Sequence, residues 1–245
     1  MTARLGTGRP TRHPAGGDPV AWHDAEHGGF AADLELFARL AGELPGAEVE
    51  DAAGHPVTAV DTDPAVLAAL AQRAAERSLP VETVRGDARA LDLGRTFPLV
   101  LAPMQLLHIA GGSAGRRRLL AAAARHLRRK GRLCAVVIEE PLPAGTGRPD
   151  PVPDVREVDG WVHSSLPTEI RIEEEGITMV RLRQLVAPDG TLTEATHTIH
   201  LDRFTLADLD RDADAAGLWV VGCERIPSTV EFEDSLAVYM EVRDG

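Results

Sequence analysis

Residues 57–74, VTAVDTDPAVLAALAQRA, decide the fold class of this 245-residue chain. The apolar run predicts a buried strand over 56–61 that ends in Asp61, and such runs are typical of parallel sheets. Asp63 is placed to cap the following helix, and Pro64 suits its first turn. Because the strand passes directly into a helix, the stretch predicts an α/β protein.

Three further strand units follow along the chain. We expect strands over about 81–84, 97–104 and 132–139, with an arginine-rich helix that ends at Gly131 before the last of them. Basic side chains near the end of this helix suit the negative end of its dipole. Strands that alternate with helices predict a mainly parallel, Rossmann-like sheet with helices on both faces.

The flanking segments have other patterns. Residues 1–18 hold Gly, Pro and Arg without an apolar segment, which predicts a flexible tail before a single domain over 19–245. Helical spacing of apolar residues predicts a helix over about 31–44. Period-two alternation with EEG and PDG turns predicts an inserted antiparallel meander over about 155–201. A helix capped by Thr205 and two antiparallel C-terminal strands complete the prediction.

Composition narrows the function classes. The net charge of −12 disfavours nucleic acid and anionic membranes as partners. No apolar run approaches the roughly 18 residues that a membrane span needs. Cys134 and Cys223 are expected to be buried, reduced thiols, and without a CxxC pattern we expect no metal site. These observations favour a cytoplasmic protein that acts on a small molecule, with homo-oligomerisation left open.

Acidic side chains follow two of the predicted strands. Ligands of open α/β sheets bind beyond the carboxyl ends of the strands. Asp61 could there accept hydrogen bonds from both ribose hydroxyls of a nucleotide, and Asp87 could accept from an adenine amino group beside the N–H of Ala88. The alternatives are a solvated turn carboxylate and a helix cap.

Four stretches together resemble the class I S-adenosylmethionine (SAM)-dependent methyltransferases of small molecules. In order and spacing they are similar to the second to fifth strand units of that family: VTAVDTDPAVLAALAQRA (57–74), VRGDARALDL (84–93), FPLVLAPMQLLHIAGG (97–112) and LLAAAARHLRRKGRLCAVVIE (119–139). WHDAEHGGFAADLELF (22–37) resembles the family's substrate-capping N-terminal helix, and the last two strands resemble its antiparallel pair. The resemblance covers about residues 20–245.

This resemblance implies SAM as the cofactor and a small-molecule methyl acceptor. It places Asp61 and Thr62 at the ribose and Asp87 and Ala88 at the adenine. It also places one further segment against the methyl donor: Ala102, Pro103 and Met104.

The first motif of the family is absent from the sequence. That motif is a strand, a GxGxG turn and a helix, whose backbone N–H groups hold the methionine part of SAM. Residues 45–56 provide only twelve positions, whereas about twenty-five are needed for strand, turn and helix. We interpret the spacing as an internal loss of about 14 residues, which predicts a missing central strand and weak or absent SAM binding. A glycine pair at 6–8 has no strand before it and does not replace the turn.

Histidines are the candidate general bases. His23 and His27 lie in the segment that would cap the site, and His108 follows the strand next to the expected acceptor. Each has an alternative interpretation as a surface or packing histidine. Metal binding by His23 and His27 with Asp24 or Glu26 has no further support in the sequence.

The sequence thus predicts a SAM-dependent methyltransferase that transfers a methyl group to an unidentified small molecule, with His23 and His108 as its catalytic residues. A non-catalytic relative that has lost SAM binding is the alternative. An NAD-dependent oxidoreductase is disfavoured, because no strand–GxGxxG–helix unit is present.

Overall fold

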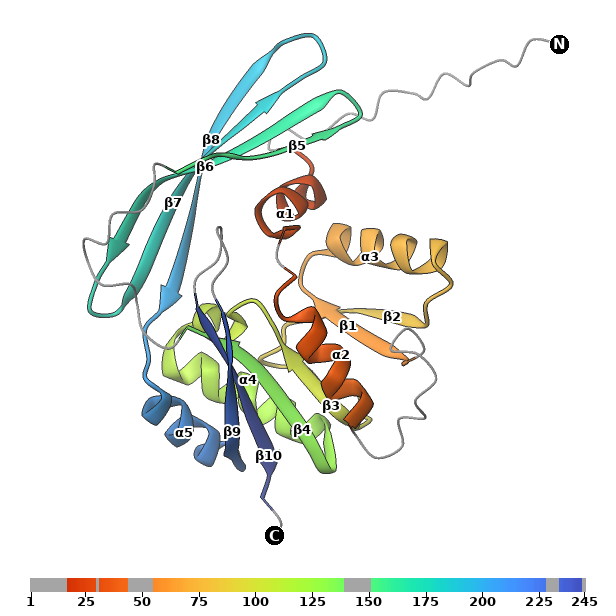
Figure 1. Ribbon diagram of the computed structural model, residues 1–245, viewed down its shortest axis with the longest axis vertical. Coiled ribbons are helices and arrows are strands. Elements are labelled where there is room, and N and C mark those ends of the chain that lie inside the picture. Colours follow the sequence, from red (N-terminus) through yellow and green to blue (C-terminus); the bar gives the residue numbers. More distant parts are fainter. Residues whose placement is uncertain (1–16, 30, 44–54, 139–150, 228–233, 244–245) are drawn as a thin grey trace, which may run out of the picture.

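The computed structural model describes residues 17–29, 31–43, 55–138, 151–227 and 234–243 (Figure 1). The N-terminal tail predicted over 1–18 lies outside these residues except for its last two, so the domain boundary stays a prediction. The helices are α1 (Pro19–His27), α2 (Leu34–Glu43), α3 (Pro64–Glu76), the short 3-10 helix η1 (Leu106–Ile109), α4 (Gly112–His126) and α5 (Leu206–Ala215).

Strands make up three sheets in the described residues. The strands are β1 (Val57–Asp61), β2 (Val81–Arg85), β3 (Phe97–Ala102), β4 (Leu127–Val137), β5 (Asp154–Val158), β6 (Trp161–Ile172), β7 (Gly176–Val186), β8 (Leu192–Asp202), β9 (Leu218–Ile226) and β10 (Ser235–Val242). The sheets are ordered β1-β2, β3-β4-β10-β9 and β5-β6-β7-β8. The fold is α/β, with parallel pairs β1/β2 and β3/β4, antiparallel C-terminal strands and an antiparallel meander, as the sequence predicts.

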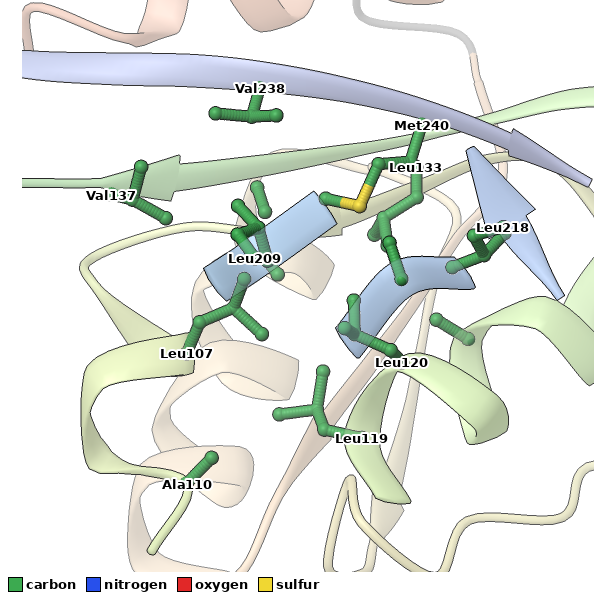
Figure 2. Close-up of a cluster of buried hydrophobic side chains, with 14 of the residues drawn as sticks. Leu107, Ala110, Leu119, Leu120, Leu133, Val137, Leu209, Leu218, Val238 and Met240 are labelled. Carbon is green, nitrogen blue, oxygen red and sulfur yellow. The ribbon is translucent and has the colours of Figure 1, made fainter. Parts of the chain in front are cut away.

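Alternating side chains of β4 fill the two faces of the four-stranded α/β sheet. Leu133, Ala135 and Val137 face α4 and α5 in the main core. Figure 2 shows Leu133 and Val137 there with Leu120 and Leu209. All five side chains are at most 1% exposed. This period-two burial is the pattern of a central strand covered on both faces.

The opposite face of the same sheet is covered by α2. Leu36 and Leu40 of this helix pack with Cys134 and Val136 of β4. Cys134 is fully buried, and burial raises the pKa of its thiol to about 12, so it is an inert packing residue as predicted. The prediction of a buried Cys223 is wrong, because this thiol is exposed on β9, which forms an edge of the sheet.

The sheet is interrupted where the sequence lacks its first motif. In the part of the chain that is described, β1 pairs with β2 alone and β3 pairs with β4 alone. Every residue of β1 and β2 is half-buried or exposed, although each strand contains two Val residues. The predicted loss of a central strand therefore has a visible counterpart, since the strand units on either side of the gap do not pair.

Helix α3 covers the small β1–β2 sheet. The Asp63 carboxylate accepts a hydrogen bond from the N–H of Ala65 at 2.8 Å, and Pro64 occupies the first turn, as predicted. Leu67 and Ala74 are the buried side chains of this helix. With so few buried side chains, the β1–β2–α3 unit has a thin core.

One boundary differs from the sequence prediction. The basic helix ends at His126 rather than at Gly131, and the residues between them belong to β4. His126 accepts a hydrogen bond from the N–H of Leu93 at 2.8 Å, which ties the end of the helix to the loop before β3. A side chain at Gly131 would lie within 3.0 Å of the Phe97 carbonyl oxygen, so the close approach of two strands requires glycine there.

Candidate functional site

The carboxyl ends of β1 and β2 lie side by side. The parallel register pairs Asp61 with Arg85, and the N–H of Gly86 donates to the Asp61 carbonyl at 2.9 Å. Asp61 Oδ1 accepts from the N–H of Asp63 at 2.7 Å. Within the described residues Oδ2 of Asp61 has no hydrogen-bond partner, so this oxygen is available to a ligand. Thr62 follows directly, and its carbonyl accepts from the side chain of Arg85.

The turn after β2 holds Asp87 in a fixed orientation. Arg89 donates to both carboxylate oxygens, with Nη2 lying 2.7 Å from Oδ2, and its backbone N–H donates to Oδ1. These hydrogen bonds lower the pKa of Asp87 to about 2, so the carboxylate is ionised at neutral pH. Arg89 also donates to the Ala110 carbonyl at 3.1 Å, which links the turn to the segment before α4. Ala88 packs against the main core.

The end of β3 contains backbone strain that the sequence did not predict. Ala102 is 2% exposed, and Pro103 follows it at the surface. Met104 and Gln105 then adopt positive φ angles of 52° and 55° in succession. Left-handed non-glycine residues cost of order 1 kcal/mol or more each and gather at functional sites. The strain therefore marks the segment that the family resemblance places against the methyl donor.

His108 is built into the core and its ring nitrogens are both engaged. The N–H of Ile138, just after β4, donates to Nε2 at 3.0 Å, so the neutral ring carries its proton on Nδ1 and donates to the Asp202 carbonyl at 2.7 Å. The ring stacks on Phe204 with centroids 4.2 Å apart. Burial lowers the pKa of His108. This geometry argues against the predicted role as general base and favours a structural role.

The contacts of His108 attach the meander to the α/β core. Asp202 ends β8, and its carboxylate also accepts from the N–H of Gly112 at the start of α4, at 2.6 Å. A small pocket borders this junction, with His108, Ile138, Phe204 and Ile177 in its lining. His108 and Asp202 thus fix where the meander stands relative to the carboxyl ends of β3 and β4.

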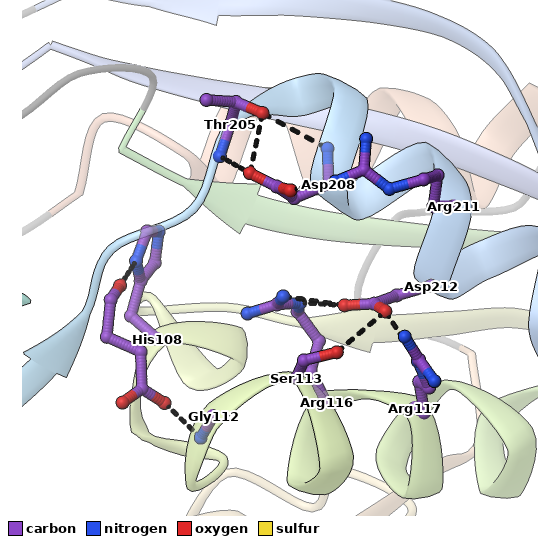
Figure 3. A network of polar contacts seen from close by, with 10 residues as sticks. His108, Gly112, Ser113, Arg116, Arg117, Thr205, Asp208, Arg211 and Asp212 are labelled. Atoms are coloured by element: carbon purple, nitrogen blue, oxygen red, sulfur yellow. Dashed lines mark hydrogen bonds and ion pairs between the residues drawn. The ribbon is translucent and has the colours of Figure 1, made fainter. Parts of the chain in front are cut away.

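A second buried network joins α4 to α5. The Asp212 carboxylate accepts from Ser113, Arg116 and Arg117, and the side chains of Arg116 and Asp212 are 4% and 3% exposed (Figure 3). The guanidinium of Arg116 also lies over the Phe204 ring. Both arginines thus bind the buried Asp212 carboxylate, Arg116 from the core and Arg117 from the surface.

Helix α1 connects the meander to α3 through two carboxylates. Glu26, with its side chain 3% exposed, accepts from Ser165 at 2.7 Å and from both Nε and Nη2 of Arg183 at 2.8 and 2.6 Å. Asp24 pairs with Arg73 of α3 and lies 3.2 Å from Arg156 of β5. Arginine hydrogen bonds lower the pKa of both carboxyls against the opposing effect of burial. No local sequence pattern indicates that these two acids bind arginines from distant elements.

The candidate base His23 lies on α1 with its side chain about half exposed. Its ring contacts that of His27 at a centroid distance of 5.3 Å. Burial and the neighbouring His23 lower the pKa of His27, so this imidazole is neutral at pH 7. Asp24 and Glu26 bind arginines, and among the described residues no group of three metal-ligating side chains includes these histidines.

The cofactor implied by the resemblance fits part of this arrangement. Asp87 is an ionised acceptor, as an adenine amino group requires. Asp61, at the adjacent strand end, uses Oδ1 for the N–H of Asp63, and its second oxygen suits a ribose hydroxyl. The amino-acid part of SAM carries a carboxylate and an ammonium group, which the family holds with the strand–GxGxG–helix unit that residues 45–56 are too short to provide. The assignments of Thr62, Ala88, Pro103 and the other site residues stay predictions.

Among the described helices, none has the length and apolar character that a membrane span requires.

Comparison with known proteins supports the resemblance. Residues 45–131 match a family model described as a methyltransferase domain. A search of curated proteins found no match. The chain is similar to the sugar N-methyltransferase KedS8 from Streptoalloteichus, with 19% identity, a TM-score of 0.64 and coverage of 99% of this chain and 100% of that one.

Two other solved structures have the same fold. The CcbJ methyltransferase of Streptomyces caelestis is 19% identical, with a TM-score of 0.64 and coverage of 92% and 97%. The SAM-bound amino pentose methyltransferase CalS10 of Micromonospora echinaspora is 21% identical, with a TM-score of 0.57 and coverage of 87% and 93%. The chain therefore has the class I methyltransferase fold over nearly its whole length, meander included.

Proposed function

We propose that this chain, a methyltransferase by its fold and by the family model that it matches, transfers the methyl group of SAM to an amino group of a small polar molecule, with amino sugars as the acceptor class. The observation that carries the proposal is the similarity to KedS8 over 99% of this chain, because it includes the meander and α1 as well as the α/β core. The alternative of a non-catalytic relative gains no support from the comparisons.

Charged side chains of the meander bind α1. The register places Arg181 beside His197, and Arg181 shares its face of β7 with Arg183. Both arginines lie against Glu26 of α1, and Arg181 also pairs with Asp154 of β5. Because these side chains are largely buried and bound to one another, they hold the helix that carries His23 and His27 against the meander.

SAM supplies an electrophilic methyl group, so the task of the protein is to hold an acceptor nitrogen in line with it. An amine reacts only as the free base, and a neutral imidazole can take the proton that an ammonium group loses. We assign this step to the His23–His27 pair on α1, because the pKa of His27 is lowered and both nitrogens of His108 are engaged.

The test is methyl transfer to matched acceptors. The chain is incubated with SAM and either an amino sugar or the same sugar with a hydroxyl in place of the amino group. The proposal predicts that only the amino sugars gain the mass of one methylene group. Transfer confined to the hydroxyl sugars, or no transfer to any member of a broad amino-sugar panel, would contradict it.

The base assignment has its own test. The variant His27→Gln should lower the methyl transfer rate most below pH 7, where the acceptor amine is protonated and needs a base. The variant His200→Gln, at a half-exposed histidine of β8, is the matched control and should leave the pH profile unchanged. A pH profile of His27→Gln equal to that of the parent chain would refute the assignment.

A further inference from the structure

The two halves of SAM make different chemical demands on a protein. The 5′-thioadenosine half offers ribose hydroxyls and an adenine amino group, which carboxylates and backbone groups can bind. The amino-acid half carries one negative and one positive charge, which need charge-assisted partners such as backbone N–H groups at a helix N-terminus. A site that lacks the partners for one half of SAM should therefore distinguish poorly between ligands that differ only in that half.

The partners for the nucleoside half are in place. Asp61 and the Gly86–Asp87 turn are joined by the backbone hydrogen bond between Gly86 and Asp61, so they move as one unit. Asp61 presents Oδ2 without a hydrogen-bond partner among the described residues. Arg89 keeps Asp87 ionised and anchors its turn to the Ala110 carbonyl. This part of the site is pre-organised by contacts that need no further strand.

The expected partners for the amino-acid half are not found between α2 and β1. Residues 45–56 contain no GxGxG turn, and twelve positions cannot form strand, turn and helix together. The structure agrees, because β1 and β3 lie on either side of a break in the sheet and each pairs only with its outer neighbour in the described residues.

The arginines near the strand ends already contact neighbouring protein atoms. Arg85 donates to the Thr62 carbonyl at 3.2 Å, and Arg89 is committed to Asp87 and Ala110. Both guanidinium groups thus donate hydrogen bonds to neighbouring protein atoms. The carboxylate of a bound amino-acid group would have to compete with these contacts.

We infer that the chain recognises its cofactor through the 5′-thioadenosine half and discriminates little by the amino-acid half. This inference rests on the proposed function, since it concerns the same cofactor site. Its consequence is that S-adenosylhomocysteine and 5′-methylthioadenosine, which share a neutral thioether and differ in the amino-acid group, compete with SAM about equally well.

The test compares the dissociation constants of these two thioethers by calorimetry on the full chain. We expect them to agree within about threefold, because each charge-assisted hydrogen bond to the amino-acid group would otherwise favour S-adenosylhomocysteine by about tenfold or more. A preference of about thirtyfold or more for S-adenosylhomocysteine would overturn the inference and leave the proposed function standing. Absence of binding by both thioethers and by SAM would overturn both.

A conservative variant tests the nucleoside partners. Asp61→Asn keeps Oδ1 as acceptor for the Asp63 N–H but removes the charge, and it should weaken both thioethers by the same factor of about tenfold. Asp63→Asn, which still caps α3, is the matched control and should leave both affinities within about twofold. If Asp61→Asn weakens S-adenosylhomocysteine alone, or neither ligand, the inference fails.

Discussion

The two parts of the α/β core differ in how completely they are packed. In the β3–β4–β10–β9 sheet, Leu133, Ala135 and Val238 are 0% exposed and helices cover both faces. In the β1–β2–α3 unit every strand residue is half-buried or exposed. The β1–β2 sheet has two strands, and α3 is the helix that packs on it, so its strands have fewer neighbours than β4 and β10. Parallel strands are usually buried on both faces, and this unit does not reach that state.

The well-packed sheet supports the fold, whereas the less packed β1–β2–α3 unit holds the predicted ligand site. The His108–Asp202 junction links η1 to the meander, and the Asp212 network links α4 to α5 beside the packed sheet. The thin unit carries Asp61 and Asp87, the predicted nucleoside partners. The cofactor would therefore bind where the protein has least stability of its own, and binding should stabilise that unit.

The largest effect on stability is expected from breaking the Asp212 network between α4 and α5. Asp212→Ala leaves Arg116, 4% exposed at its side chain, without its buried partner, so we expect a loss of about 3–5 kcal/mol in the free energy of unfolding. Denaturant titration followed by circular dichroism measures it. Asp214→Ala, at an exposed position of the same helix, should cost less than about 1 kcal/mol. Equal losses for the two variants would show that the network does not stabilise the core.

The same truncation made in each part of the α/β core compares how tightly the two parts are packed. Val238→Ala removes two buried methyl groups from β10 and should cost about 2–3 kcal/mol, including the cavity that remains. Val60→Ala makes the same change in half-buried β1 and should cost less than about 1 kcal/mol. The same denaturant titration compares them. A cost for Val60→Ala as large as that for Val238→Ala would mean that β1 is fully packed in solution.

A smaller effect should appear in the pH dependence of stability. The pKa of His108 is lower in the folded chain than its usual value near 6.5, so the unfolded chain binds more protons as the pH falls below about 6.5. The stabilisation from neutral His108 is therefore present above pH 6.5 and is lost as the pH falls toward the folded pKa. His27 and His197 have lowered pKa values and add to the same trend.

The variant His108→Gln isolates this contribution. We expect it to be less stable than the parent chain at pH 7.5 and to lose less stability between pH 7.5 and 5.5. Chemical denaturation of both proteins at pH 7.5 and pH 5.5 measures how much free energy of unfolding each loses between the two pH values. An equal loss in the variant and the parent chain would show that His108 is not held neutral by the fold.

Local sequence signals were the reliable predictors of the fold. Asp63 with Pro64 predicted the start of α3, and Thr205 caps α5 in a box with Asp208. These contacts span only a few residues, so the chain determines them locally. The end of α4 was misplaced because the basic run after His126 suits a helix, whereas the contact of Gly131 with β3 depends on a distant strand.

The site was predicted less completely for the same reason. The positions of Asp61 and Asp87 at strand ends could be predicted from the strand pattern, while their roles toward a cofactor stay predictions. Glu26 binds Arg183, 157 residues away, and no local pattern indicates such a pair. His108 was assigned as a base because the sequence does not reveal that the Ile138 N–H and the Asp202 carbonyl engage its ring.

Hydrogen exchange with and without S-adenosylhomocysteine tests the central claim most directly. Without ligand, amides of β1 and β2 should exchange faster than those of β4 and β10, because the thin unit opens without global unfolding. Saturating ligand should slow exchange in β1, β2 and the turn at Gly86–Ala88, and leave β4 and β10 unchanged. Equal protection of the two halves without ligand, or a ligand effect confined to β4 and β10, would contradict the account.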